Sequence, residues 1–131
     1  MPTLRLDLGR IATLTLARPD RRNALTLEMA DELGQAVSTI ASDPEVRVVL
    51  VRGEGHSFCA GGDFDLIEAA STRPVEDNRL AMRRFYASML IVARIRVPTI
   101  AVVQGAAVGA GLCLAAACDL RLDNASHLAD E

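Results

Sequence analysis

Lysine and tryptophan are absent from the chain, and aromatic side chains are few: Phe58, Phe64, Phe85 and Tyr86. All fourteen basic residues are arginine, and seventeen acidic residues outnumber them, which gives a formal net charge of -3. This balance excludes the strongly basic surface by which proteins bind nucleic acid. Half of the residues (50%) are nevertheless hydrophobic, so the composition is that of a globular domain whose core consists of Leu, Val, Ile and Ala.

Cysteines are also few, namely Cys59, Cys113 and Cys118. An odd number without CxxC spacing argues against a disulfide framework and a zinc site, and it is typical of reduced thiols in the cytoplasm. The segment from Met1 to Arg10 lacks the apolar core of a signal peptide. We therefore expect a cytoplasmic protein without a bound metal.

One long stretch, from Val97 to Cys118, carries no charge, and its length alone would suffice for a membrane-spanning helix. Pro98 stands at its start, and Gln104-Gly105 and later glycines interrupt it, which is incompatible with one continuous helix. The stretch is therefore predicted to form a strand, a turn and a helix of a protein that does not enter the membrane.

Hydrophobic periodicity divides the chain into strands and helices. Period-two alternation predicts an N-terminal hairpin, continuous apolar runs predict parallel strands buried on both faces, and i, i+4 spacing predicts amphipathic helices. The predicted strands are 4–8, 11–16, 46–51, 99–103 and 119–122, and the predicted helices are 25–40, 64–70, 75–95 and 109–117. Strands that alternate with helices over this length predict a single α/β domain with a parallel sheet.

Two of the predicted strands each run into a glycine-rich turn that precedes a helix. The turns are Phe58-Cys-Ala-Gly-Gly-Asp63 and Gly105-Ala-Ala-Val-Gly-Ala-Gly111. A helix start presents unpaired N–H groups and the positive end of the helix dipole, and small residues let a ligand approach the backbone. If the turns face each other, one N–H from each could converge on a single oxygen as an oxyanion hole. The alternative, a packing device where a strand enters a helix, stays open.

These two turns, with Ala24-Leu25 after Arg18-Pro19 and with Cys118-Asp-Leu-Arg121, resemble the enoyl-CoA hydratase/isomerase (crotonase) family in order and spacing over essentially the whole chain. The resemblance implies the crotonase-like (ClpP/crotonase) fold of repeated ββα units, with residues 1–131 as a single domain that lacks its C-terminal half. It also implies an acyl-CoA thioester as substrate in fatty acid metabolism. Coenzyme A would be part of that substrate, no separate cofactor is implied, and a full-length form would be a homotrimer or hexamer.

Carried over by position, the resemblance implies that the first oxyanion N–H belongs to Gly62 and the second to Ala110. Gly109 and Gly111, one residue away on either side, are alternatives for the second donor. Asp63 is expected to cap the helix that follows it. The substrate-binding residues implied in the same way are Arg21, Arg22, Ala24, Phe58, Ala60, Gly61, Asp63, Gly109 and Gly111. For the two arginines we favour a solvated loop over a specific phosphate contact.

The sequence departs from the family at Cys113, because hydratases resemble one another in having their first catalytic glutamate at this position. The second family glutamate belongs just beyond Glu131, where the sequence stops. Double-bond isomerisation, which can use a single base, therefore fits the sequence at least as well as hydration. A cysteine in an alanine-rich helix is more often a small core residue than a nucleophile. His56 and His127 have no partner at metal-ligand spacing and are predicted to be surface residues.

Two other functions are weighed against this interpretation. The second turn matches the GxxxGxG pattern of NAD(P)-dependent short-chain dehydrogenases, but it comes late in the chain, and Tyr86 is not followed by lysine at the fourth position. A strict GxGxxG pattern would also require a small residue at Leu114. The second alternative, a non-catalytic crotonase-like acyl-CoA-binding protein or fragment, is favoured by the replacement at Cys113.

Overall fold

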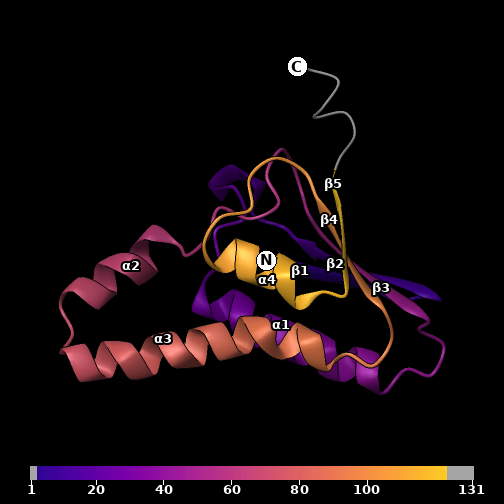
Figure 1. Cartoon of the computed structure of the whole chain (residues 1–131), viewed down its shortest axis with the longest axis horizontal. Helices are drawn as coiled ribbons and strands as arrows, with labels where there is room; N and C mark the ends of the chain where they lie inside the picture. The colour runs from indigo at the N-terminus through magenta and orange to yellow at the C-terminus, as the bar shows by residue number, and fades with distance from the viewer. Residues whose placement is uncertain (1–2, 124–131) are drawn as a thin grey trace.

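The structure is a computed structural model that describes residues 3–123 (Figure 1). Five strands form one sheet: β1 (Leu4–Asp7), β2 (Ile11–Leu16), β3 (Val48–Gly53), β4 (Thr99–Val103) and β5 (Leu120–Asp123). Their order across the sheet is their order along the chain. β1 and β2 pair as an antiparallel hairpin, and each later neighbouring pair is parallel. The predicted hairpin and parallel sheet are confirmed.

Helices connect the strands. They are α1 (Leu27–Ala41), α2 (Phe64–Ser71), α3 (Val75–Leu90) and α4 (Ala110–Ala117), with the short 3-10 helices η1 (Pro19–Arg21) and η2 (Ile91–Arg94). α1 begins two residues later than predicted because Leu25 is extended and forms a β-bridge with Gly62. The side chain of Thr26 then caps α1, since its Oγ1 accepts a hydrogen bond from the Met29 N–H at 3.1 Å.

The α-helix in the structure is shorter than the helix predicted over 75–95. It ends at Leu90 and tightens into η2, a common way for a helix to terminate before an extended segment. The uncharged stretch from Val97 to Cys118 contains β4, a turn and α4, as predicted. No helix in residues 3–123 is long and apolar enough to cross a bilayer.

The two faces of the sheet differ in burial. One face packs toward the helices and is closed to solvent, as shown by the buried side chains of Leu14, Leu16, Val49, Val51 and Ala101. The opposite face is also apolar but less covered. Val48, Leu50 and Ile100 are half-buried there, while Leu120 and Leu122 are 57% and 54% exposed. The prediction that the parallel strands are buried on both faces is therefore wrong for this chain, because an apolar run indicates hydrophobicity and does not specify what covers it.

The helical layer has a close part and a distant part (Figure 1). The C-terminal half of α3 packs on α1 and α4 through the buried side chains of Phe85 and Met89. Figure 1 shows α2 and the N-terminal end of α3 standing away from the sheet, and Val75 at that end is 76% exposed. The first glycine-rich turn leads directly into this outlying pair of helices.

Candidate functional site

The two glycine-rich turns lie against each other. The Cys59 N–H donates a hydrogen bond to the Ala106 carbonyl at 3.1 Å, and the Val108 N–H donates to the Cys59 carbonyl at 3.1 Å. These bonds form a short parallel bridge between Cys59 and Ala107. The strands β3 and β4, which lead into the two turns, are direct neighbours in the sheet. The sheet topology thus brings together two turns that are far apart in the sequence.

Glycines allow this close approach. Gly61 has a φ of +102°, and a Cβ added to it would lie 3.0 Å from the Val108 carbonyl oxygen. A Cβ on Gly111 would lie 2.5 Å from the Cys59 carbonyl oxygen, closer than real side chains approach backbone oxygen. Any side chain at Gly111 would therefore push α4 away from the first turn.

We expect Gly111→Ala to lower the free energy of unfolding by roughly 1–3 kcal/mol, because the added methyl group overpacks the contact with Cys59. Gly34 provides a matched control, since it lies within α1 and a Cβ there meets nothing within 4 Å. Gly34→Ala should raise stability by about 0.5–1 kcal/mol. Urea unfolding followed by circular dichroism measures both, and equal effects of the two substitutions would contradict the close packing of the turns.

Several backbone N–H groups of these turns have no hydrogen-bond acceptor among the described residues. They include both predicted donors, Gly62 and Ala110, and also Gly109, whereas the Gly111 N–H donates to the Val108 carbonyl at 2.9 Å. Ala110 is the first residue of α4, where an N–H has no intrahelical partner. Around Gly62, the Gly61 carbonyl and the Asp63 N–H both bond to Leu25. Since successive N–H groups of an extended segment point to opposite sides, the Gly62 N–H points away from Leu25.

Asp63 fixes the start of α2 in the manner expected of a helix cap. Its Oδ2 accepts a hydrogen bond from the Asp65 N–H at 3.1 Å. Its Oδ1 accepts a second bond, from the guanidinium of Arg18 at 3.2 Å, and both side chains are largely buried. Arg18 also donates to the Ala24 carbonyl at 2.6 Å. The predicted cap is confirmed. The structure adds Arg18 as the side chain that joins this cap to the loop between β2 and α1.

Asn23 holds that loop in place and was missed by the sequence analysis. It is fully buried, and its side-chain oxygen accepts a hydrogen bond from the Arg18 N–H at 2.9 Å. Its amide nitrogen donates to the carbonyls of Glu54 and Ser57 at 2.9 and 2.8 Å. Its φ is 57°, a left-handed conformation that asparagine tolerates better than most residues. The one available signal was that an asparagine stands among the arginines of this loop. The interpretation of the whole segment as solvated gave no reason to expect Asn23 to be buried.

The remaining residues predicted for substrate binding lie around the same turns. Arg21 and Arg22 are exposed, as a solvated loop requires, whereas Ala24 and Ala60 are half-buried and Phe58 is fully buried. Exposure and burial alone do not test contact with a substrate, so the substrate-binding roles of these residues stay predictions.

The three cysteines occupy different environments. Cys59 and Cys118 are buried, and burial raises the pKa of each thiol to about 11, so both are poor nucleophiles at neutral pH. Cys113, in α4, is half-buried and thus more accessible than the core residue that the sequence analysis favoured. His56 is exposed, as predicted, and His127 lies outside the described residues. Within residues 3–123 no group of three or more His, Cys, Asp or Glu is placed to hold a metal ion.

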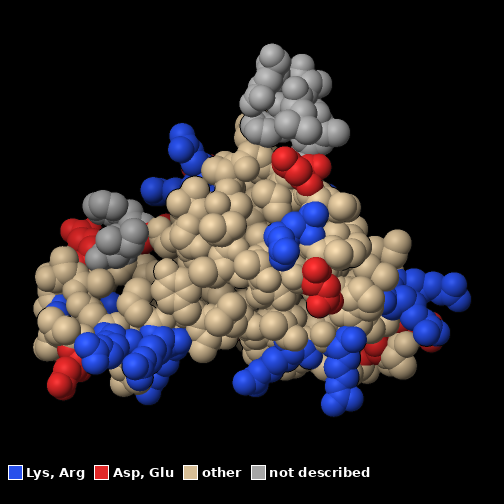
Figure 2. Space-filling view, viewed as in Figure 1, with Lys and Arg blue, Asp and Glu red and all other residues tan. Residues whose placement is uncertain are grey.

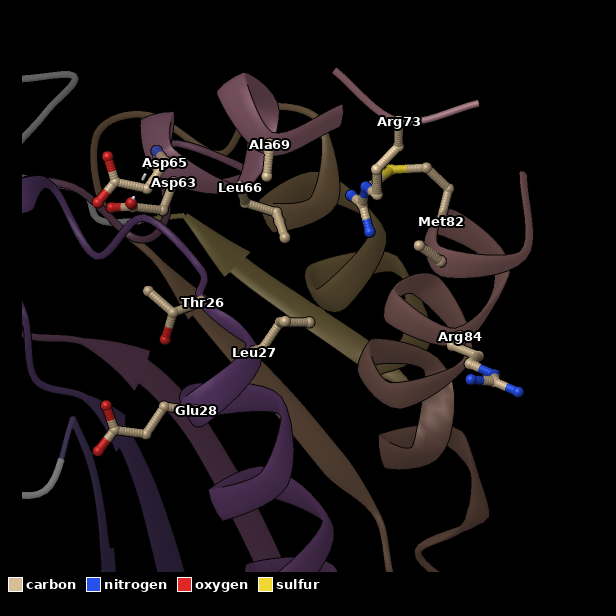
Figure 3. A pocket seen from close by; sticks show the side chains of 11 residues that line it. Thr26, Leu27, Glu28, Asp63, Asp65, Leu66, Ala69, Arg73, Met82 and Arg84 are labelled. Carbon is tan, nitrogen blue, oxygen red and sulfur yellow. Dashed lines mark hydrogen bonds between the residues drawn. The ribbon is translucent and has the colours of Figure 1, made fainter. Parts of the chain in front are cut away.

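A hollow of about 560 Å³ opens next to the first turn (Figure 3). It lies between the start of α1, the helix α2 and the N-terminal half of α3. Asp63 forms part of its wall at the end nearest Gly62, and Leu66, Ala69 and Met82 provide an apolar lining. The hollow can accommodate an apolar chain beside the first glycine-rich turn.

Comparison with known structures identifies the class that this fold and site define. A crystal structure of an enoyl-CoA hydratase from Shewanella pealeana matches with a TM-score of 0.86 and 28% sequence identity. The match covers 93% of this chain and 46% of that chain. The fold is therefore crotonase-like, as the sequence predicted.

The enoyl-CoA hydratase/isomerase family model matches residues 8–129, and the chain belongs to this family. A Mycobacterium tuberculosis protein named probable enoyl-CoA hydratase EchA14 is 43% identical over 120 residues, covering 92% of this chain and 46% of that protein. The 1,2-epoxyphenylacetyl-CoA isomerase of Escherichia coli is 35% identical over 111 residues, covering 84% and 42%. The chain thus spans about half the length of these relatives. The dehydrogenase alternative receives no support from these matches.

Proposed function

We propose that the chain binds acyl-CoA thioesters and stabilises their enolates with the N–H groups of Gly62 and Ala110. The observation that carries the proposal is that the two glycine-rich turns are hydrogen-bonded to each other, and the N–H groups of Gly62 and Ala110 on them are among those without an acceptor in the described residues. Family membership supports an enzyme of the hydratase or isomerase type. Coenzyme A enters as part of the substrate, and the proposal involves no separate cofactor.

The chemistry follows from where charge develops. Removing a proton next to a thioester carbonyl, or adding water across its conjugated double bond, places negative charge on the carbonyl oxygen. Preorganised N–H groups stabilise that charge without reorganising, and the N-terminus of α4 adds the positive end of a helix dipole behind Ala110. The loop that carries the exposed Arg21 and Arg22 would face the coenzyme A nucleotide, with the two side chains solvated and without a specific phosphate contact.

The reaction class depends on the proton donor and acceptor. Cys113 stands where hydratases carry their first glutamate, so the first of the two acids that the addition of water would use is missing. Isomerisation, which moves a proton with one base, fits the chain at least as well. The relatives include both classes by name, a probable enoyl-CoA hydratase and an acyl-CoA isomerase. A non-catalytic acyl-CoA-binding protein is the second candidate, and the replacement at Cys113 favours it. In a full-length form we expect a homotrimer or hexamer in the cytoplasm.

Calorimetric titration of the purified chain with crotonyl-CoA, free coenzyme A and NAD tests the proposal. We expect crotonyl-CoA to bind more tightly than free coenzyme A, because only the thioester presents a carbonyl oxygen and an acyl chain. NAD serves as the control for the dehydrogenase alternative and should not bind. Equal affinity for crotonyl-CoA and free coenzyme A would overturn the proposed site at Gly62 and Ala110.

A further inference from the structure

The hollow beside α2 has a cationic end that the proposed function does not use. Arg73 stands at the junction of α2 and α3, and Figure 3 shows its side chain reaching into the hollow. Its Nε atom is buried and has no hydrogen-bond partner within residues 3–123. An unpaired donor in a buried position is unfavourable. The atom therefore marks a place where an acceptor atom of a ligand would be stabilised.

The surroundings of Arg73 are mostly apolar. Leu66 and Ala69 of α2 and Ala81 and Met82 of α3 line the hollow around it. Charges in such surroundings are screened less than charges in open solvent. The guanidinium group also offers parallel N–H groups that match the two oxygens of a carboxylate. A carboxylate is thus the ligand group that this part of the hollow suits.

The charges along the hollow give it a direction. In Figure 3 the carboxylates of Asp63 and Asp65 lie close together on the side of the hollow opposite Arg73, and Glu28 lies on the same side but apart from them. The Asp63 end is also the end next to Gly62. A ligand with one anionic tail would be repelled from the acidic side and attracted to Arg73. Its other end would then lie toward the Gly62 N–H.

The junction that carries Arg73 is held in position. Asn78, in the first turn of α3, donates a side-chain hydrogen bond to the Ala70 carbonyl at the end of α2. Arg84 of α3 also lines the hollow. The exposed Arg79 and Arg83 lie on the same helix, and Figure 2 shows basic side chains gathered over this end of the molecule. Such a cluster raises the local concentration of anions near the entrance.

We propose that the acyl group accepted by this chain carries a carboxylate at its far end, and that Arg73 binds it. The inference rests on the proposed function, which places the thioester oxygen at Gly62. The eight residues of α2 separate the two ends of the hollow by about 12 Å at 1.5 Å per residue. An eight-carbon chain extends for about 9 Å, given C–C bonds of about 1.5 Å in a zigzag. The preferred substrates are therefore medium-length dicarboxylic acids joined to coenzyme A at one end.

A matched pair of ligands tests this assignment: octanoyl-CoA and suberyl-CoA, which differ by a terminal carboxylate. Calorimetric titration of the full chain should give suberyl-CoA roughly a 10- to 100-fold advantage over octanoyl-CoA, the range for a hydrogen bond to a charged group. Arg73→Met should remove this advantage and leave octanoyl-CoA binding nearly unchanged. Arg73→Lys should retain part of it. Arg79→Met, which removes an exposed charge from α3, is the control and should keep the preference.

The outcomes distinguish failure of the carboxylate site at Arg73 from failure of acyl-CoA binding itself. If both thioesters bind equally, and both more tightly than free coenzyme A, the carboxylate inference is wrong and the proposed function stands. If neither binds more tightly than free coenzyme A, the proposed function itself fails. A preference that survives Arg73→Met would remove Arg73 from the site. Lower thermal stability of Arg73→Met with an unchanged preference would assign Arg73 a purely structural role beside Asn78.

Discussion

Ala110→Pro is expected to slow exchange of the α-protons of an acyl-CoA with D2O by roughly 100- to 1000-fold, the usual cost of removing one oxyanion donor. Proline has no N–H, and Ala110 is the first residue of α4, a position where proline is well tolerated. The substitution therefore removes the donor and retains the helix. Proton exchange followed by NMR reports enolate formation directly, so the prediction is independent of whether the chain completes hydration or isomerisation.

Ala110→Gly is the matched control, because it retains the N–H and removes only a buried methyl group. It should exchange α-protons at nearly the rate of the unchanged chain. Circular dichroism of both variants should show the same helix content. If Ala110→Pro exchanged protons as fast as Ala110→Gly, the Ala110 N–H would not contact the thioester oxygen. Gly62→Pro extends the test to the other donor.

Asn23→Ala is expected to lower the free energy of unfolding by roughly 3–5 kcal/mol, since it leaves three partly buried backbone groups without partners at about 1–3 kcal/mol each. The groups concerned are the Arg18 N–H and the carbonyls of Glu54 and Ser57. Urea denaturation followed by circular dichroism measures the effect. Acyl-CoA binding should weaken as well, because the loop and the first glycine-rich turn are held together through this side chain.

Two substitutions in the same loop sharpen the result. Arg21→Ala removes an exposed side chain and should change stability by no more than about 0.5 kcal/mol. Asn23→Asp retains an oxygen that can accept from the Arg18 N–H but cannot donate to the two carbonyls, so it should remain strongly destabilising. Comparable stabilities of Asn23→Ala and Arg21→Ala would mean that the hydrogen bonds of Asn23 do not hold the loop.

Local patterns predicted the elements of this fold well. The strands β1 and β2 could be predicted from alternation, and β3 and β4 from apolar runs. In each case the side chains of the strand itself carry the pattern. The cap at Asp63 was equally local, since it involves the next two residues. By contrast, the α1 boundary was set by the distant pairing of Leu25 with Gly62, which no window around residue 25 contains.

The contacts that hold the candidate site in place could not be predicted from the sequence, because they too join distant segments. The ion pair of Arg18 and Asp63 joins residues 45 positions apart, and Asn23 reaches carbonyls more than thirty positions away. Neither contact leaves a periodic signal. The contact between the glycine-rich turns was inferred only as a possibility, because it requires β3 and β4 to be neighbours. Arg73 gave no signal at all, since its significance comes from a hollow formed by three helices.

The sheet order has a consequence for how the molecule can form during synthesis. Each strand pairs with the strand that precedes it in the chain, so no strand has to wait for a distant later segment. As the chain leaves the ribosome, β3 can add to the finished hairpin, then β4 to β3, and the oxyanion turns come together once β4 has docked. Pairing in chain order keeps loop-closure entropy low and limits the time that an apolar strand edge stays exposed. The order of synthesis can therefore favour the strand pairing that brings the two glycine-rich turns together.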